Sequence, residues 1–290
     1  MEDRGSSLGS VKPEKLIRLS KSCLSDAEKQ AVMGVLDREY LGMGVEVQQF
    51  EQSLSEFFGR PTVSVVNGTA ALHLALQAIG IGQGDEVLVQ SLTYVASFQA
   101  ISATGATPVA CDVNKLTLTL DLEDAEKRLT KNTKALMPVH FSGDVGELHE
   151  IYVFAEKHNL RVIEDAAHAF GTEYKGKKVG GFGDIACFSF DGIKNITSGE
   201  GGCIVTEDIE VLKKVKEARL LGIENDTEKR FSGKRSWNFD VVEQGWRYHM
   251  SDLMAAIGRV QLQRFPKTLA IRQKRAIFYD KCLAGHACIE

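Results

Sequence analysis

Short apolar runs alternate with helical stretches along most of the chain, and this alternation limits the possible folds more than any other feature. The apolar runs have the length of strands and lie at residues 62–66, 86–89, 107–111, 135–139, 161–164 and 185–190. Helical patterns lie between them, at residues 69–79, 94–103 and 148–158. Strands that alternate with helices form a mainly parallel sheet with helices on both faces. The sequence therefore predicts an α/β fold with three layers, α/β/α.

The pattern changes after Met250. Residues 252–263 read as one long helix, and Pro266 separates it from a second helical stretch that runs nearly to the end of the chain. We therefore expect a large domain over residues 1–250, and a connecting helix over residues 251–290 that begins a further domain. No internal repeat or low-complexity linker divides the large domain.

Composition restricts the class of protein. The chain has 290 residues, of which 43% are hydrophobic and 26% charged, values typical of a globular protein. The formal net charge is -4 and the 35 Lys and Arg residues are scattered, so the basic surface of a nucleic-acid-binding protein is not expected. Residues 1–7 lack the apolar core of a signal peptide, and no apolar run has the ~18 residues of a membrane span. The sequence predicts a cytoplasmic protein that binds neither nucleic acid nor membranes.

The six cysteines include no Cys-x-x-Cys pair, so neither a zinc site nor a redox-active pair is predicted. Cys111, Cys187 and Cys203 lie within apolar, strand-like runs, where a reduced and buried thiol is expected. The remaining ones are Cys23, Cys282 and Cys288. We therefore expect a reducing compartment and no metal ligands.

Polar residues that follow strands are the candidates for chemistry, because ligands of such sheets bind beyond the carboxyl ends of the strands. Lys194 follows the strand at 185–190, either as a solvated loop cation or as a lysine that forms a Schiff base with an aldehyde. Asp165 follows the strand at 161–164, either as a helix N-cap or as the carboxylate that keeps the ring nitrogen of pyridoxal phosphate protonated. Together they favour a pyridoxal phosphate enzyme with Asp165 and Lys194 as catalytic residues.

Five further residues near strand ends are candidates for cofactor binding. Gly68 and Thr69 open a helix, so their backbone N–H groups suit a phosphate, although any strand-to-helix turn can use these residue types. Ser189 would add a hydroxyl to the same phosphate, or is a plain polar residue at a strand end. Tyr94 would place its ring on the pyridine face, or is a half-buried aromatic residue. His168 would hydrogen-bond the phenolic oxygen of the cofactor, or is a polar residue satisfied elsewhere.

Ordered motifs cover nearly the whole chain. They are NGTAAL at 67–72, TYVA at 93–96, VIEDAAHAFG at 162–171, GDIACFSF at 183–190, KN at 194–195, GEGG at 199–202 and YHMSDL at 248–253. In this order they resemble the DegT/DnrJ/StrS family of sugar aminotransferases. The resemblance implies the aspartate aminotransferase fold (fold type I), pyridoxal phosphate as cofactor, glutamate as amino donor and a nucleotide-linked keto-sugar as acceptor. It also implies that Lys194 carries the cofactor as a Schiff base, and it supports the roles given above for Asp165, Gly68, Thr69, Tyr94, His168 and Ser189.

Two features depart from the family pattern. Members commonly have Asn-Tyr-Arg where this chain has Arg247-Tyr248-His249, a segment that in relatives helps to complete the cofactor site of the neighbouring subunit. Arg247 would still bind a phosphate there, whereas His249 leaves the recognition of the donor carboxylate unassigned. Relatives also continue past residue 290 into a smaller C-terminal domain, which we expect to be largely missing here, in a fragment or in a truncated product.

The resemblance implies a homodimer, the commonest closed assembly, that makes an amino sugar for a polysaccharide, glycan or secondary metabolite. One alternative is sugar dehydration on the same fold, but relatives with that chemistry have His in place of the lysine, and Lys194 argues against it. A second alternative is a catalytically silent protein that binds pyridoxal phosphate. The nucleotide, and the choice between the third and fourth sugar carbon, depend on pocket shape rather than on motifs.

Overall fold

A seven-stranded sheet forms the centre of the molecule. The computed structural model describes residues 20–233 and 238–286, and within them the strand order is β1-β9-β8-β5-β4-β2-β3, with β1 and β3 at the edges. All strands of this sheet except β9 run in one direction, because β9 pairs antiparallel with β1 and β8 and the other pairs are parallel. The strands are β1 (Thr62–Val65), β2 (Glu86–Gln90), β3 (Thr107–Cys111), β4 (Thr133–Met137), β5 (Arg161–Asp165), β8 (Ile185–Ser189) and β9 (Gly202–Thr206). A separate hairpin joins β6 (Glu173–Tyr174) to β7 (Lys177–Lys178).

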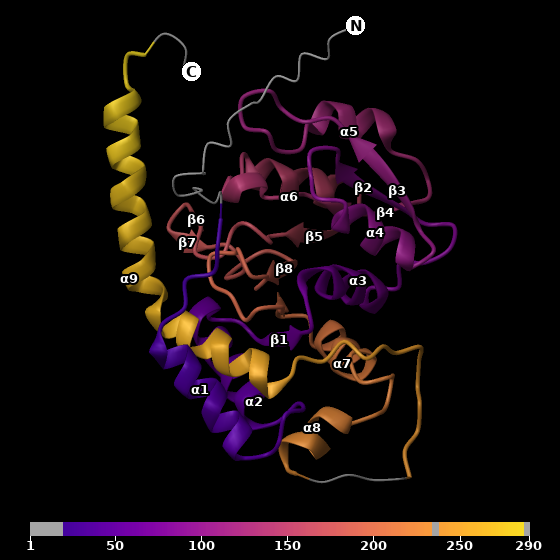
Figure 1. The fold of residues 1–290 in the computed structure, drawn as a ribbon. Coiled ribbons are helices and arrows are strands. Elements are labelled where there is room, and N and C mark those ends of the chain that lie inside the picture. Colours follow the sequence, from indigo (N-terminus) through magenta and orange to yellow (C-terminus); the bar gives the residue numbers. More distant parts are fainter. Residues whose placement is uncertain (1–19, 234–237, 287–290) are drawn as a thin grey trace, which may run out of the picture.

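Helices cover both faces of the sheet, which confirms the predicted three layers (Figure 1). One face packs residues such as Ile163 and Ile204 against α3 (Gly68–Ala78), α4 (Ala96–Ala103) and α7 (Ile209–Ala218). The other face packs residues such as Leu136 and Phe188 against α2 (Val45–Phe58), α5 (Leu122–Arg128), α6 (Leu148–Lys157) and the first part of α9 (Asp252–Leu283). The remaining helices are α1 (Asp26–Asp37), which packs on α9, the 3-10 helix η1 (Phe141–Gly143) and α8 (Asp226–Phe231).

Strand β4 lies two residues before its predicted position of 135–139. The difference has a local cause, since Pro138 has no N–H to donate to a neighbouring strand. Its carbonyl still accepts a hydrogen bond from the backbone N–H of Asp165, and Val139 forms an isolated bridge to the same residue. The segment after β4 is therefore fixed against the end of β5.

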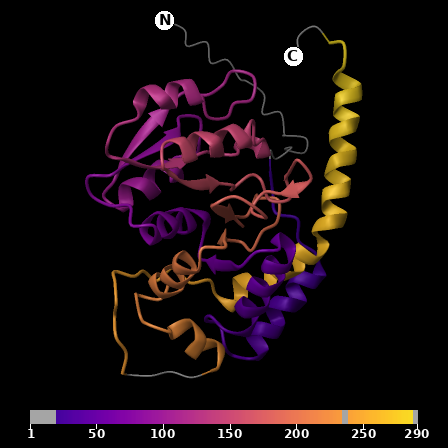
Figure 2. The same ribbon diagram turned by 180° about the vertical axis from the view of Figure 1, so that it is seen from behind.

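The long helix α9 is continuous through Pro266, so the predicted separation into two helices at this residue is wrong. A proline in a helix removes one hydrogen bond and bends the helix, but packing on either side can keep it intact. Phe265 is buried and packs edge-on against Phe57 and Phe170, which anchors this point of the helix. Figures 1 and 2 show the first part of α9 along α1 and α2, and its second part bent away from the rest of the fold. The domain division at residue 250 stays a prediction.

Asp252 joins the start of α9 to the start of α2. Its side chain is buried, and Oδ1 accepts hydrogen bonds from the backbone N–H groups of Gly44 at 2.8 Å and Val47 at 3.1 Å. The N-cap of α2 is a glycine and provides no side-chain acceptor. Asp252 therefore stabilises the orphan N–H groups of that helix, as a capping residue does.

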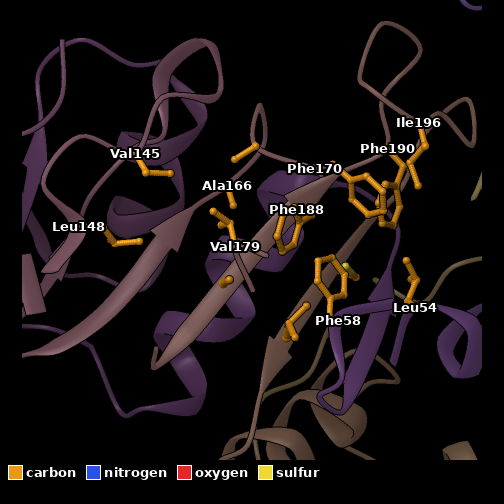
Figure 3. Close-up of a cluster of buried hydrophobic side chains, with 14 of the residues drawn as sticks. Leu54, Phe58, Val145, Leu148, Ala166, Phe170, Val179, Phe188, Phe190 and Ile196 are labelled. Carbon is orange, nitrogen blue, oxygen red and sulfur yellow. The ribbon is translucent and has the colours of Figure 1, made fainter. Parts of the chain in front are cut away.

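An aromatic cluster packs behind the strand ends. Phe58, Phe170, Phe188 and Phe190 point toward one another in Figure 3, with ring centroids 4.8 Å apart for Phe58 and Phe188, and 5.9 Å apart for Phe170 and Phe190. Phe170 lies shortly after the 165–168 segment and Phe190 shortly before Lys194. Because buried aromatic rings contribute both area and geometric specificity, this cluster holds two site-bearing loops at a fixed separation.

The three cysteines predicted to be buried, Cys111, Cys187 and Cys203, are buried and free. Burial raises the pKa of Cys187 and Cys203 well above the usual range for a thiol, so both stay protonated. Cys288 and residues 1–7 lie outside the described residues. Within the described part of the chain, no helix combines the length and the apolar character that a membrane crossing requires.

Candidate active site

The carboxyl ends of the parallel strands open into a cavity of about 660 Å³. This is the size of a typical small-molecule or cofactor site, and its position agrees with the rule for parallel sheets. The segments that follow β1, β2, β4, β5 and β8 all contribute to its wall. Among the wall residues are seven of the eight predicted from the sequence: Gly68, Thr69, Tyr94, Asp165, His168, Ser189 and Lys194.

Asp165 ends β5 and is only 5% exposed. Its Oδ2 accepts a hydrogen bond from Ser97 Oγ at 2.7 Å, and its Oδ1 accepts one from the backbone N–H of Ala167 at 3.2 Å. The segment directly after Asp165 is not a helix, since the next element is β6, so the alternative interpretation as a helix N-cap is wrong. A buried carboxylate in a cavity wall is a suitable partner for a protonated ring nitrogen.

His168 follows Asp165 in the wall of the cavity. Its Nδ1 accepts a hydrogen bond from the backbone N–H of Ser142 at 3.3 Å, which places the proton of the neutral ring on Nε2. Burial lowers the pKa of His168 below its ordinary value of 6.5, the positive charge of Lys194 lowers it further, and Asp165 opposes the shift. His168 is therefore neutral at pH 7 and has an N–H to donate to an oxygen such as the phenolic oxygen of pyridoxal phosphate.

Lys194 lies in the turn after β8, where its backbone N–H donates to the carbonyl of Asp191 at 3.0 Å. The residue is partly buried and lines the cavity rather than pointing wholly into solvent. Among the described residues, Lys194 is the one lysine or arginine of the wall, whereas Asp165, Asp191 and Glu200 are its carboxylates. This position favours the Schiff-base interpretation over that of a solvated loop cation.

The N-terminus of α3 forms part of the cavity wall. Asn67 caps the helix by accepting the backbone N–H of Ala70 at 2.8 Å, while the first N–H groups of a helix have no intrahelical partner. Gly68 and Ser189 lie so close that a Cβ atom on the glycine would be 2.9 Å from Ser189 Cβ. Together with the Thr69 and Ser189 hydroxyls, this backbone cradle fits a phosphate dianion. The residues present therefore fit pyridoxal phosphate at both its phosphate and its ring nitrogen.

Tyr94 and Arg247 lie differently from the other predicted residues. Tyr94 lines the cavity but is 74% exposed, so the alternative of a half-buried aromatic residue is wrong. A ring at the mouth of the cavity has a free face for stacking. Arg247 is exposed, forms an antiparallel bridge with Leu220 and is not part of the cavity wall. Within one chain, the structure does not bring Arg247 to the other site residues.

Ser97 is a residue of the site that the sequence did not identify. It is fully buried in the first turn of α4 and bonds to Asp165, which is 68 residues away in the chain. The sequence did contain a signal for Ser97. It lies four residues after Thr93, a spacing that places two side chains on one side of a helix, and this helix start includes the predicted site residue Tyr94. The motif at 93–96 ends one residue before it.

The solved structures of similar fold include two aminotransferases. PseC of Helicobacter pylori, an aminotransferase involved in the biosynthesis of pseudoaminic acid, matches with a TM-score of 0.87 and 30% identity, over 94% of this chain and 72% of that chain. The PLP form of Spr1654 from Streptococcus pneumoniae matches with a TM-score of 0.85 and 32% identity, over 93% of this chain and 72% of that chain. With the lysine, the carboxylate and the phosphate cradle in one cavity, the fold defines a pyridoxal phosphate-dependent aminotransferase.

The chain belongs to the DegT/DnrJ/EryC1/StrS aminotransferase family, whose model matches residues 22–289. It is 41% identical to GDP-perosamine synthase of Caulobacter vibrioides over 263 residues, which are 90% of this chain and 68% of that protein. It is also 41% identical to the spore coat polysaccharide biosynthesis protein SpsC of Bacillus subtilis over 254 residues, 87% of this chain and 65% of that protein. The chain thus spans about two thirds of the length of these relatives. The family, fold class, cofactor and aminotransferase activity expected from the sequence are confirmed.

Proposed function

We propose that this protein moves an amino group from glutamate to a nucleotide-linked 3-keto or 4-keto hexose in amino-sugar biosynthesis. The observation that carries the proposal is that Lys194 and Asp165 line one cavity with the N-terminus of α3. The names of the relatives support the substrate class, because one is a GDP-perosamine synthase and another a spore coat polysaccharide biosynthesis protein. The net reaction converts glutamate to 2-oxoglutarate and the sugar ketone to an amine.

Each side chain of the site has a separate role in this reaction. Pyridoxal phosphate, when bound, supplies the electron sink that allows an α proton to leave the amino acid. Lys194 Nζ would hold the cofactor covalently, and its amine would accept the α proton of the donor and return it. Asp165 would keep the ring nitrogen protonated, and His168 would donate Nε2–H to the phenolic oxygen. The Thr69 and Ser189 hydroxyls would bind the phosphate at the start of α3.

We also propose that the site is completed across a homodimer. The described wall carries one lysine and three carboxylates, whereas the phosphate, the two carboxylates of glutamate and the diphosphate of a nucleotide sugar all add negative charge. Additional cations are required to bind these groups. Arg247 of the partner subunit is a suitable source, since Arg247 is exposed and does not serve the cavity of its own chain. A cytoplasmic location is proposed as well, in line with the free thiols at Cys111, Cys187 and Cys203.

The test combines spectroscopy with covalent mapping. The purified protein is mixed with pyridoxal phosphate, its visible absorbance is recorded, glutamate is added to one portion and borohydride to another, and the reduced portion is digested for peptide mass mapping. We expect a reduced adduct on Lys194 and bleaching of the visible band by glutamate. Lys194→Ala should lose both signals, whereas Lys131→Ala, at an exposed lysine outside the cavity, should keep them.

A panel of 3-keto and 4-keto nucleotide sugars then tests the acceptor, with the amino sugar detected by mass spectrometry. An adduct on Lys194 without any response to glutamate would favour the dehydratase or the silent cofactor-binding alternative. No adduct at all would overturn the cofactor assignment for this chain. Light scattering tests the homodimer, and turnover by a monomer would exclude a shared site.

A further inference from the structure

Asp165 is connected through Ser97 to the hydroxyl of Thr93. Ser97 is fully buried in α4, and its Oγ lies 2.7 Å from Asp165 Oδ2. The same Oγ is 2.7 Å from Thr93 Oγ1, at the mouth of the cavity beside Tyr94. Thr93, Ser97 and Asp165 therefore form a continuous series of short hydrogen bonds that joins two residues of the cavity wall, Thr93 and Asp165, through the buried Ser97.

The direction of these hydrogen bonds follows from the chemistry of their ends. An ionised carboxylate only accepts hydrogen bonds, and a serine hydroxyl has a single proton to donate. Ser97 must therefore donate to Asp165, and the hydroxyl of Thr93 must donate to Ser97 Oγ. The backbone carbonyl of Tyr94, 3.4 Å from Ser97 Oγ, is the weaker competing acceptor for that proton.

The hydrogen bonds from Thr93 and Ser97 affect the charge state of Asp165. Burial withdraws the water that would otherwise stabilise a carboxylate, and Asp165 is only 5% exposed. Hydrogen bonds donated to a carboxylate favour its anionic form, and they are stronger than hydrogen bonds between neutral groups. An anionic partner leaves the shared proton on the ring nitrogen, whereas a carboxylate deprived of its donor attracts that proton to itself.

We propose that Thr93 and Ser97 form a hydroxyl relay in which Ser97 is the positioning residue that orients Asp165 and holds it anionic. The relay rests on the proposed cofactor chemistry, but it makes a separate claim about two residues outside the predicted site. The relay also links Asp165, the proposed partner of the ring nitrogen, to Tyr94, the proposed stacking residue, since Thr93 directly precedes Tyr94 in the chain. Loss of the relay would shift the shared proton from the ring nitrogen toward Asp165 without changing how substrate binds.

The experiment compares Ser97→Ala, Ser97→Thr and Thr93→Val with wild type, and uses Ser102→Ala, an exposed serine of the same helix, as the matched control. The direct readout is the nitrogen-15 chemical shift of bound pyridoxal phosphate labelled at its ring nitrogen. We expect the value of a protonated nitrogen in wild type and in Ser102→Ala. We expect a shift toward the unprotonated value in Ser97→Ala, a smaller shift in Thr93→Val, and recovery in Ser97→Thr, which keeps the hydroxyl.

Kinetics give a second readout that a merely structural role would not reproduce. The rate of the glutamate half-reaction should fall by at most about 100-fold in Ser97→Ala, the lower end of the ~10²–10⁴-fold that a proton-transfer group contributes, because Lys194 and Asp165 remain, while the glutamate concentration at half-maximal rate changes less than about twofold. A nitrogen shift and a rate equal to those of wild type in Ser97→Ala would overturn the proposal. So would a rise in KM with kcat unchanged.

A double-mutant cycle in the apoprotein separates failure of the relay from failure of the proposed function. Ser97→Ala and Asp165→Asn are combined, and the thermal unfolding midpoints of the four proteins are compared without cofactor. Coupled residues give non-additive effects, so Ser97→Ala should lower the midpoint less in the Asp165→Asn background than in wild type. Additive effects would overturn the relay even if Lys194 binds the cofactor, and coupling would support it even if the sugar substrates fail.

Discussion

Asn195 and Arg272 are joined by a side-chain hydrogen bond of 2.6 Å, from Arg272 Nη1 to Asn195 Oδ1, across 77 residues of chain. The Nδ2 group of Asn195 donates at the same time to the carbonyl of Phe170 at 2.9 Å. Asn195 directly follows Lys194, so both bonds act on the turn that presents the lysine. The turn is thereby fixed to the loop after His168 on one side and to α9 on the other.

Replacing Asn195 by Ala should slow the glutamate half-reaction about 10- to 100-fold, because a displacement of about 1 Å in a reacting group has an effect of that size. Stopped-flow absorbance of the cofactor band measures this rate. Arg272→Ala removes only one of the two anchors and should have a smaller effect. Wild-type rates in Asn195→Ala would show that the turn is held by other contacts.

Gly68→Ala should weaken the binding of pyridoxal phosphate at least tenfold, about 1.4 kcal/mol. The added methyl group would be 2.9 Å from Ser189 Cβ and would displace the hydroxyl from the phosphate end of the cavity. Absorbance titration of the apoprotein gives the dissociation constant. Gly82→Ala is the matched control, since the nearest atom there is 3.8 Å away, and its affinity should equal that of wild type.

His168 should titrate at a pH below its ordinary value of 6.5, because burial and the charge of Lys194 both oppose protonation. Activity that requires the neutral ring should consequently persist as the pH falls through 6.5 and be lost only in more acidic solution. NMR of the ring protons of the apoprotein follows the titration. In Lys194→Ala the midpoint should rise, since a repelling charge has been removed; an unchanged midpoint there would contradict the assigned contact.

The stability of the fold should decrease between about pH 6.5 and pH 4 because of His249. Burial and the charges of Arg230, Arg247 and Arg219 lower the pKa of His249 to about 4, and its Nδ1 is buried without a hydrogen-bond partner among the described residues. Between these pH values His249 binds a proton in the unfolded chain but not in the folded chain, so acid favours unfolding.

Urea denaturation at a series of pH values tests this expectation for His249. The variant His249→Gln should lose about 2 kcal/mol of the pH-dependent change in the free energy of unfolding between pH 7 and pH 4. His149→Gln, at an exposed histidine, should keep the wild-type dependence. Parallel curves for His249→Gln and wild type would show that this histidine titrates alike in both states.

Tyr152→Phe should lower the free energy of unfolding by about 1–3 kcal/mol, the cost of leaving buried polar groups unpaired. The Tyr152 hydroxyl donates to Glu164 Oε1 and accepts the backbone N–H of Asp184 at 3.0 Å, while Glu164 Oε2 is 2.7 Å from His140 Nε2. Burial, together with the charge of Glu164, raises the pKa of Tyr152 well above its usual value, so the phenol remains a donor. Chemical denaturation measures the loss, and Tyr279→Phe, at an exposed tyrosine, should show almost none.

The sequence predicted well those features that depend on neighbouring residues. The strand at 107–111 was located correctly and α6 to within one residue, because alternation and helical periodicity are local signals. Asp165, Lys194 and His168 line one cavity because parallel strands bring their carboxyl ends to one edge of a sheet. The proline at 266 gave the wrong boundary, since packing of Phe265 outweighs the local preference to end a helix.

Contacts between distant residues could not be read from the sequence. The bond from Ser97 to Asp165 and that from Arg272 to Asn195 depend on how layers pack, and neither pair has a characteristic spacing. Arg247 illustrates the same limit, because an exposed residue of one chain acts in a shared site only if a second chain is present. The roles of the site residues stay predictions until the variants described above are measured.

Strand β3 lies at the edge of the sheet, and its proline has a consequence for aggregation. The backbone N–H of Thr107 donates inward to Asp85 and the carbonyl of Cys111 accepts inward from Ser91, so the intervening Pro108 would direct an N–H outward if it had one. An open edge with a missing donor is a poor template for another strand. At the opposite edge, β1 is buried beneath α2. Copies of this chain should therefore associate through helices and loops, and resist the strand-by-strand growth that leads to fibrils.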